Sequence, residues 1–259
     1  MTAVLKSTSH GHTMVLTISN PDHRNALGPE IYAAGIEALT AADSNPEVRS
    51  VVITGEGAHF CAGGNLRRLL ANRQQASEVQ AQSIDGLHGW IDAIRTFPKP
   101  VIAAVEGAAA GAGFSLALAC DFIVAAQDAV FVMAYTSVGL SPDGGGTWSL
   151  AHALPRQIAS ELVMCGDRIS AERLHQLGVV NRVSLPAQAL SEAIGLGQRL
   201  NARAPNTLAS AKELLAEARF NSMSRHLDAE KEHFVRNLHH PNGGAGISAF
   251  LEKSTPHYE

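Results

Sequence analysis

The chain has 259 residues, of which 46% are hydrophobic and 17% charged, and its formal net charge is −4. This length can bury a substantial core in one or two domains, and the composition is typical of a soluble enzyme. The negative charge and the lack of Lys/Arg runs argue against nucleic-acid binding, and no apolar run is long enough to predict a membrane span.

Short apolar runs alternate with helical segments over the first two-thirds of the chain. Helices are expected from about residue 29 to 43 and, with a polar interruption, from about 66 to 96. Strands rich in Val and Ile are predicted at 14–18, 51–54, 101–105, 122–126 and 179–183. This alternation indicates an α/β fold with a covered sheet.

The strand signals end near Pro186, and the rest of the chain is predicted to be helical. Helices are expected at 207–220, 219–238 and 246–251. One apolar face of the first contains Leu208, Ala211, Leu215 and Ala218. We therefore expect an α/β core over residues 1–190 and a helical module over 191–259, whose apolar faces indicate oligomerisation.

Two glycine-rich segments each follow a predicted strand and precede helical sequence. The first contains Gly63 and Gly64, and the second covers residues 107–113. Glycine lets a ligand approach the backbone closely, and the start of a helix offers free N–H groups. If both turns face one carbonyl oxygen they form an oxyanion hole; the alternative for each turn is close packing of strand against helix.

A third glycine cluster, residues 139–148, contains Asp143 just before a helical segment. Helix N-capping is the default interpretation of an aspartate in that position. The other interpretation is catalytic, because a carboxylate in an apolar, glycine-lined cleft can act as base or acid near neutral pH. The two roles are compatible.

Other catalytic motifs are missing from the sequence. It contains no GxSxG, no P-loop, no GxGxxG after a strand and no HExxH, and the spacing of its histidines does not predict a metal site. The three cysteines are widely spaced, which is typical of a reducing compartment. A nucleophilic role for Cys61 is disfavoured because no histidine with an orienting partner is identifiable beside it. The first residues lack the apolar run of a signal peptide, so a cytoplasmic location is expected.

Seven segments, in this order, resemble the crotonase (enoyl-CoA hydratase/isomerase) superfamily, and the resemblance covers essentially the whole chain. They are NPDHRNAL at 20–27, FCAGGNL at 60–66, PKPVIAAVEG at 98–107, GAG at 111–113, ACD at 119–121, GVVNRV at 178–183 and AFLEK at 249–253. The resemblance implies a spiral of ββα units with a C-terminal helical trimerisation module, assembled as a homotrimer or a dimer of trimers. It also implies an acyl-CoA thioester as substrate, with no cofactor besides this coenzyme A.

The resemblance assigns roles to individual residues. The N–H groups of Gly64 and Ala112 hold the thioester oxygen while an enolate forms, Asp143 is the acid/base, and Asp121 is structural. The implied substrate contacts are Ala62, Asn65 and Leu66 near the adenine, Arg24 and Arg67 at the phosphates, and Phe250 and Lys253 at the nucleotide of a neighbouring subunit. Ala26 and Ser115 are further expected substrate contacts. Tyr135 is expected to shape the acyl pocket, with packing as its alternative. For the two arginines the alternative is solvation of the surface.

The chain departs from the hydratases of this superfamily, which use two glutamates to add water. Ser115 and Tyr135 occupy those two positions, so the usual water-activating pair is missing. Asp143 matches a position that carries a catalytic aspartate in several relatives, including dienoyl-CoA isomerases. One carboxylate is enough to move a proton along an acyl chain, so isomerisation of an enoyl-CoA is the main prediction.

Three alternatives stay open. Asp143 could activate water in a hydratase or in a hydrolase of a cyclic enol-ether CoA ester, or it could attack a halogenated aryl ring. The third alternative is a non-catalytic acyl-CoA binder. The acyl group is not defined by the sequence, although Phe114 and the small residues 108–110 predict a hydrophobic pocket.

Overall fold

The computed structural model describes residues 3–259 and is built around a six-stranded sheet in the order β1-β2-β3-β4-β6-β9. Its strands are β1 (Val4–His10), β2 (Thr13–Ser19), β3 (Ser50–Gly55), β4 (Val101–Val105), β6 (Phe122–Ala126) and β9 (Arg182–Ser184). Strands β1 and β2 are antiparallel, and the other neighbours are parallel. Parallel neighbours need crossover connections, which the helices provide.

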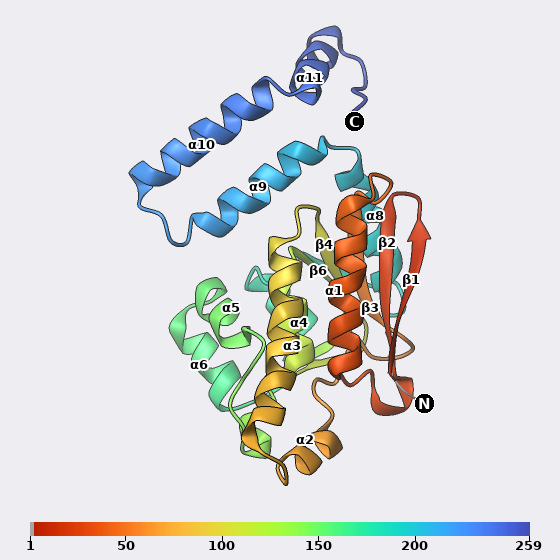
Figure 1. The fold of residues 1–259 in the computed structure, drawn as a ribbon, viewed down its shortest axis with the longest axis vertical. Helices are drawn as coiled ribbons and strands as arrows, with labels where there is room; N and C mark the ends of the chain where they lie inside the picture. The colour runs from red at the N-terminus through yellow and green to blue at the C-terminus, as the bar shows by residue number, and fades with distance from the viewer. Residues whose placement is uncertain (1–2) are drawn as a thin grey trace.

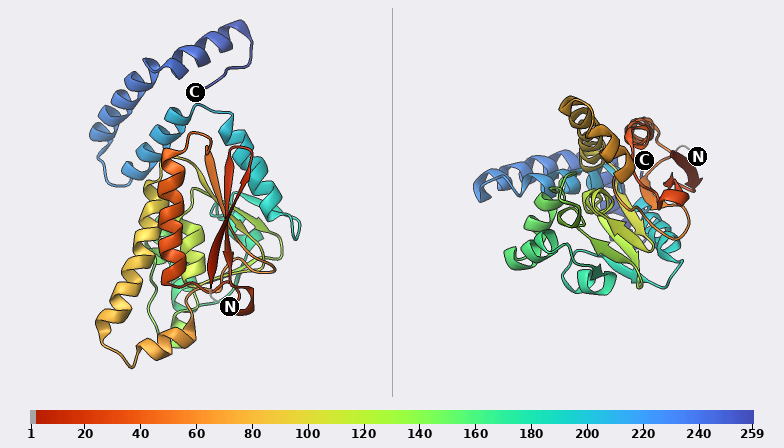
Figure 2. Two further views of the ribbon diagram at one scale, coloured as in Figure 1. Left: turned by 45° about the vertical axis from the view of Figure 1, so that its right-hand side comes forward. Right: turned by 90° about the horizontal axis from the view of Figure 1, so that it is seen from below.

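Helices cover both faces of this sheet. The α-helices of the described residues are α1 (Pro29–Ser44), α2 (Leu66–Asn72), α3 (Ser77–Thr96), α4 (Ala112–Ala119), α5 (Gly146–Ala153), α6 (Arg156–Met164), α7 (Ala171–Gln176), α8 (Ala189–Asn201), α9 (Pro205–Glu217), α10 (Met223–Leu238) and α11 (Pro241–Glu252). In Figure 1, α1 and α3 run side by side across one face, and Figure 2 shows α8 on the other. In the described part of the chain, no helix has the length and apolar character needed to cross a membrane.

Alternating side chains of the strands enter two separate hydrophobic clusters. Leu16 and Ile53 point into the larger cluster, which contains the buried residues of α1 and α3. Their neighbours Val15 and Val52 point into a smaller cluster with α8. Burial on both faces explains why these strands are nearly continuous apolar runs, and this confirms the predicted α/β fold with a covered sheet.

A second, smaller sheet has three strands in the order β5-β7-β8. Its strands are β5 (Ala108–Ala110), β7 (Val130–Val132) and β8 (Ile169–Ser170). Strand β5 follows β4 after a two-residue turn, and it also forms a bridge between Ala109 and Cys61. The short sheet therefore joins the first glycine-rich segment to the second.

The predicted strand at 179–183 was wrong at its start. Strand β9 begins at Arg182. The N–H groups of Val179 and Val180 instead donate to the carbonyl oxygen of Leu174, at 2.9 and 3.3 Å. These residues close the end of α7, so their apolar side chains reflect packing rather than strand pairing.

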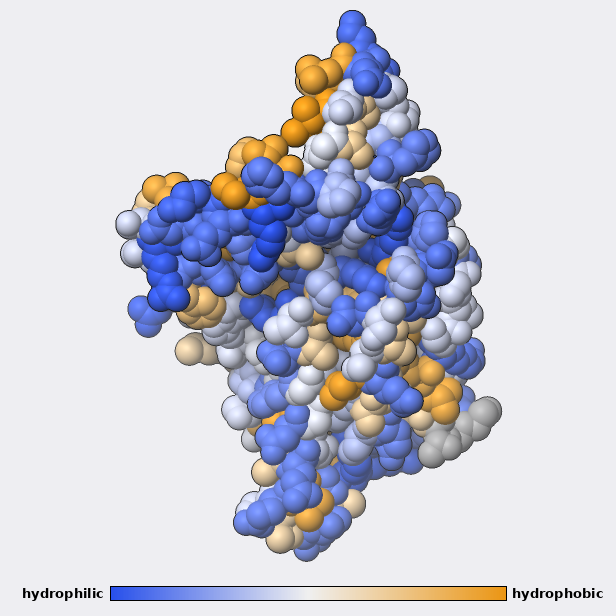
Figure 3. All heavy atoms as spheres, turned by 45° about the horizontal axis from the view of Figure 1, so that its top comes forward, coloured by the Kyte–Doolittle hydropathy of each residue, from blue (hydrophilic) through white to orange (hydrophobic). Residues whose placement is uncertain are grey.

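The last three helices extend away from the sheet, as Figure 1 shows. Leu215, Phe220 and Phe250 are 72%, 74% and 84% exposed. Figure 3 shows hydrophobic side chains gathered along these protruding helices. The apolar face predicted at 207–220 therefore lies largely uncovered, while α8 packs on the sheet. The division of the chain at residue 190 stays a prediction.

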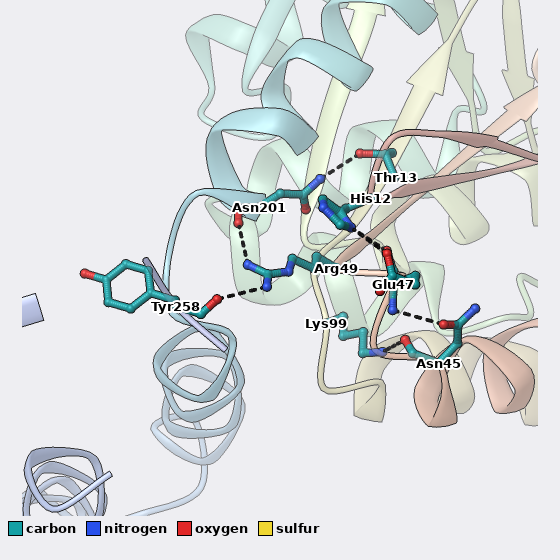
Figure 4. A network of polar contacts seen from close by, with 8 residues as sticks. All are labelled: His12, Thr13, Asn45, Glu47, Arg49, Lys99, Asn201 and Tyr258. Atoms are coloured by element: carbon teal, nitrogen blue, oxygen red, sulfur yellow. Dashed lines mark hydrogen bonds and ion pairs between the residues drawn. The ribbon is translucent and has the colours of Figure 1, made fainter. Parts of the chain in front are cut away.

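Polar contacts at two places, Arg49 and Asp121, fasten the C-terminal part to the sheet. Arg49, just before β3, donates to the carbonyl oxygens of Asn201 at 3.3 Å and Tyr258 at 3.0 Å (Figure 4). The carboxylate of Asp121 accepts from the Val101 N–H and from Lys212 Nζ of α9, each at 2.8 Å. These contacts agree with the structural role that the resemblance implies for Asp121.

Candidate active site

The two glycine-rich turns lie directly against each other. The Cys61 N–H donates to the Ala108 oxygen at 3.0 Å, and the Ala110 N–H donates to the Cys61 oxygen at 2.9 Å. A Cβ atom built on Gly63 would lie 2.6 Å from the Ala110 oxygen and 3.2 Å from the Ala112 nitrogen. Only glycine fits here, since its φ of +88° also disfavours other residues. The first turn therefore reaches the start of α4.

Two backbone N–H groups are available at this junction. Ala112 is the first residue of α4, where a helix leaves its N–H groups without internal partners. Gly64 is held by a bridge in which the Leu27 N–H donates to the Gly63 oxygen at 2.8 Å. Within residues 3–259, neither the Gly64 nor the Ala112 N–H donates to another group of the chain. Such donors are what an oxyanion hole requires, although their catalytic role stays a prediction.

A carboxylate and a phenol meet beside these amides. The Tyr135 hydroxyl donates to Oδ1 of Asp143 at 2.6 Å. A Cβ atom on Gly111, the N-cap of α4, would lie 3.6 Å from Cζ of Tyr135, so the ring packs against the helix start. The Ser115 hydroxyl donates to the backbone oxygen of Asp143 at 2.9 Å. Asp143 is thus held through its side chain and its backbone next to the second turn.

The default interpretation of Asp143 as a helix cap was wrong. Gly145 is the N-cap of α5, and no side chain caps this helix. Gly144 and Gly145 have φ values of +61° and +75°, and they turn the chain between Asp143 and the helix. The carboxylate is therefore directed to Tyr135 instead of the helix N–H groups.

Tyr135 is a neutral hydrogen-bond donor. Burial raises the pKa of the Tyr135 hydroxyl, and the nearby charge of Asp143 raises this pKa further. Only 9% of the residue is exposed. Because the phenol keeps its proton at neutral pH, it can donate to Asp143 but cannot itself act as a base.

The thiol of Cys61 lies in the first turn but is unreactive by environment. It is fully buried, and burial raises its pKa to about 12. Its sulfur accepts a hydrogen bond from the Gly63 N–H at 3.3 Å. A thiol needs to ionise to attack, so its contribution here is to the shape of the turn.

Most of the residues predicted to contact the nucleotide gather near the first turn. The Ala62 N–H donates to the carbonyl oxygen of Arg24 at 2.9 Å. Asn65 caps α2 by accepting from the N–H groups of Arg67 and Arg68 at 3.0 and 3.2 Å. Ala26 is buried, whereas the side chains of Arg24, Leu66 and Arg67 are exposed on the surface of this region.

Phe250 and Lys253 lie far from these residues in the same chain. Both are at the end of α11, which Figure 1 places at the opposite end of the molecule from α2. Phe250 is 84% exposed. Their predicted contact with the nucleotide of a neighbouring subunit stays a prediction.

Two further side chains near the site were not singled out from the sequence. Tyr32 of α1 is 4% exposed. Burial raises the pKa of its hydroxyl, and the nearby guanidinium of Arg68 offsets part of this rise. Asp143 and Cys61 also influence the Tyr32 hydroxyl electrostatically. Sequence separation hides this proximity, because Tyr32 and Arg68 come from different helices.

Comparisons with known proteins agree with this geometry. Residues 9–259 match the family model described as Enoyl-CoA hydratase/isomerase. The 1,2-epoxyphenylacetyl-CoA isomerase of Escherichia coli (strain K12) is 32% identical over 95% of this chain and 94% of its own length. The 2,3-dehydroadipyl-CoA hydratase of the same organism has the same identity and coverage. The crystal structure of an enoyl-CoA hydratase from Polaromonas sp. JS666 superimposes with a TM-score of 0.98 at 71% identity, covering 99% of this chain and 100% of that one.

Proposed function

Since the chain belongs to the enoyl-CoA hydratase/isomerase family, we propose that it moves the double bond of an enoyl-CoA, with Asp143 as the acid/base. The observation that carries this proposal is the Asp143 carboxylate, held by Tyr135 at 2.6 Å beside the start of α4. No other carboxylate occupies the two positions at which hydratases of the family carry glutamates, since Ser115 and Tyr135 stand there.

The proposed reaction is a proton transfer through an enolate. The thioester oxygen of a β,γ-enoyl-CoA accepts hydrogen bonds from the N–H groups of Gly64 and Ala112. The Asp143 carboxylate removes a proton from the α-carbon, and the electron pair of that C–H bond moves toward the thioester oxygen. The carboxyl group then returns the proton to the γ-carbon. The product is the α,β-enoyl-CoA, with no atom gained or lost and no cofactor required.

Tyr135 and Ser115 position the carboxylate in this scheme. The Tyr135 bond occupies one lone pair of Oδ1, which leaves Oδ2 to meet the substrate. Ser115 is 1% exposed, and its hydroxyl already donates to the Asp143 backbone, so it has no free base beside it. Fixing the carboxylate in advance lowers the reorganisation needed at the transition state.

Water addition is the second candidate. It is favoured by one observation, the name enoyl-CoA hydratase carried by the solved structure at 71% identity. In that reaction Asp143 would direct a water molecule at the β-carbon. A third candidate, a non-catalytic acyl-CoA binder, has the same binding surface without proton exchange.

One experiment separates these candidates. The protein is incubated in deuterated water with 3-hexenoyl-CoA and, separately, with crotonyl-CoA, and α-carbon deuteration, double-bond position and hydration are measured. We expect deuteration and migration with the first substrate and little hydration of the second. Faster hydration of crotonyl-CoA would support the hydratase, and binding without deuteration would support the non-catalytic binder.

The Asp143→Asn variant completes the test. Exchange at the α-carbon should fall by about 10²–10⁴-fold, the usual contribution of a general base. Binding of acyl-CoA, measured by calorimetry, should stay within a few-fold. Exchange at the wild-type rate in this variant would overturn the assignment of Asp143.

We also propose that the chain assembles as a homotrimer or a dimer of trimers. The exposed apolar side chains on α9, α10 and α11 support this, since such patches are rare on monomers. Sedimentation of the wild-type protein should give a mass of three or six chains. A monomer at micromolar concentration would contradict the proposal.

A further inference from the structure

A cationic side chain and a phenol lie together on one side of the candidate active site. A Cβ atom on Gly28 would lie 2.8 Å from Nη1 of Arg68, so the guanidinium lies over the first turn of α1. Tyr32 follows one turn later, and its N–H donates to the Gly28 oxygen at 3.1 Å. Residues four apart share one face of a helix. Arg68 and Tyr32 are therefore neighbours across the contact between α2 and α1.

Packing fixes the ring of Tyr32. A Cβ atom on Gly86 of α3 would lie 3.4 Å from Cδ2 of Tyr32, and the centroids of the Tyr32 and Trp90 rings are 6.5 Å apart. The ring is thus held between α1 and α3. The loop of the proposed base meets the same part of α3, since a Cβ atom on Gly144 would lie 3.4 Å from Cδ2 of Leu87. The ring is therefore packed beside the helix that this loop contacts.

Arg68 has no internal counter-ion in the described structure. No Asp or Glu oxygen lies within 4.0 Å of its guanidinium nitrogens, and its Nε is buried without a hydrogen-bond partner. Glu30 is a neighbouring carboxylate, with Oε2 also 2.8 Å from the Cβ position of Gly28. A partly buried cation and an unpaired buried donor are costly, and an incoming anion would satisfy both.

Resting on the proposed function, we propose that Arg68 and Tyr32 bind a carboxylate at the far end of the acyl group. The preferred substrate is then the CoA thioester of an unsaturated dicarboxylic acid. A guanidinium presents two parallel N–H donors that match a carboxylate, and the phenol adds a third donor. The Arg68 guanidinium lies over Gly28. The preceding residue, Leu27, donates its N–H to the Gly63 oxygen at 2.8 Å, so the cation lies near the first turn and the carboxylate belongs to a short acyl chain.

Binding measurements test this inference without requiring turnover. Calorimetry compares saturated adipyl-CoA, whose acyl chain ends in a carboxylate, with hexanoyl-CoA, whose acyl chain has the same length and ends in an uncharged methyl group. We expect the wild-type protein to bind adipyl-CoA about tenfold or more tightly, as one charge-assisted interaction allows. The Arg68→Met variant should lose this preference while its affinity for hexanoyl-CoA stays within about threefold. Tyr32→Phe should lose part of the preference.

Two matched variants serve as controls. Arg73→Met removes an exposed arginine at the end of the same helix and should leave the ratio of the two affinities unchanged. Glu30→Gln removes the competing carboxylate and should raise the ratio. Equal affinities in the wild-type protein, or an Arg68→Met variant that weakens both thioesters equally, would overturn the inference.

Turnover measurements distinguish a failure of the carboxylate-binding inference from a failure of the proposed isomerase activity. Proton exchange in deuterated water is followed with 3-hexenedioyl-CoA and 3-hexenoyl-CoA. The inference predicts a higher kcat/KM for the dicarboxylic substrate, expressed mainly in KM, and the loss of this difference in Arg68→Met. Exchange with both substrates at equal kcat/KM refutes only the inference. A preference for adipyl-CoA without exchange of either substrate refutes only the proposed function.

Discussion

The hydroxyl of Tyr135 donates a 2.6 Å hydrogen bond to Oδ1 of Asp143, which lies eight residues later in the chain. A glutamate would stand in place of this tyrosine in the hydratases that the sequence resembles. The substitution turns a position for a second carboxylate into a donor that holds the first one. The activity of the Asp143 carboxylate should therefore depend on its hydrogen bond to Tyr135.

Tyr135→Phe tests the coupling of the pair. Without the hydroxyl the carboxylate loses its fixed orientation, so kcat for proton exchange should fall about tenfold with little change in KM. The double variant Tyr135→Phe/Asp143→Asn should be no slower than Asp143→Asn alone, because residues that act as a unit are non-additive. Fully additive losses would show that Tyr135 contributes only packing.

Gly63→Ala tests the close approach of the two turns. The added Cβ would lie 2.6 Å from the Ala110 oxygen, and the residue would keep an unfavourable φ of +88°. Exchange activity should fall by about 100-fold or more, because small displacements of catalytic groups are costly. Gly57→Ala is the matched control, since its φ is +76° and no atom lies within 4 Å of the added Cβ. It should cost only about 1–2 kcal/mol of stability. Equal activity in the two variants would show that the close contact between the two turns is not needed for proton exchange.

The reactivity of Cys61 should follow its burial. With a pKa of about 12, raised from 9.0, the thiol stays protonated at pH 8 and should resist iodoacetamide in the native protein. The exposed Cys165 should be alkylated under the same conditions, which mass spectrometry can show. Rapid modification of Cys61 without unfolding would contradict its proposed inertness.

The same shift makes a pH-dependent contribution to stability. The pKa of Cys61 is higher in the folded chain, so its contribution is complete below pH 9 and is lost as the pH rises toward about 12. Cys61→Ala should therefore show a weaker loss of stability over this alkaline range in urea unfolding. Parallel pH profiles for the two proteins would show that Cys61 does not contribute.

Lys212→Met tests the attachment of α9. The side chains of Lys212 and Asp121 are 14% and 22% exposed, and Lys212 is the main group that opposes the burial-induced rise in the Asp121 pKa. Removing the lysine leaves this carboxylate without its counter-ion, which should lower the free energy of unfolding by about 2 kcal/mol. Lys231→Met removes a pair whose side chains are 67% and 66% exposed, and it should have no measurable effect. Equal effects in denaturant titrations would refute the structural role.

The sequence predicted the buried sheet better than its edges. Strands β3, β4 and β6 are buried on both faces, so their Val and Ile runs were visible. Strand β1 was missed because it is an edge strand that is largely exposed, and its polar residues carry no apolar alternation. The three short strands of the second sheet contain two or three residues each, too few for any periodicity to be recognised.

At the candidate site, features encoded by local sequence were predicted, whereas contacts between distant segments were not. The glycine turns were predictable because close backbone approach requires glycine in the sequence itself. The partner of Asp143 was not, since the two glycines after it redirect its carboxylate away from the helix it was expected to cap. The proximity of Tyr32 and Arg68 depends on how α1 and α2 pack, which no local pattern encodes.

The amides of Gly64 and Ala112 belong to the main chain, and this limits what a mutational survey can detect. Ala112 is already the residue that an alanine scan would introduce, and alanine at Gly64 keeps its N–H while meeting only the tip of Leu69 at 3.8 Å. A systematic screen would thus find Asp143 and the glycines that shape the bends, yet report the proposed electrophilic donors as silent. Exchanging the amide for an ester, through semisynthesis, is the substitution that would reveal them.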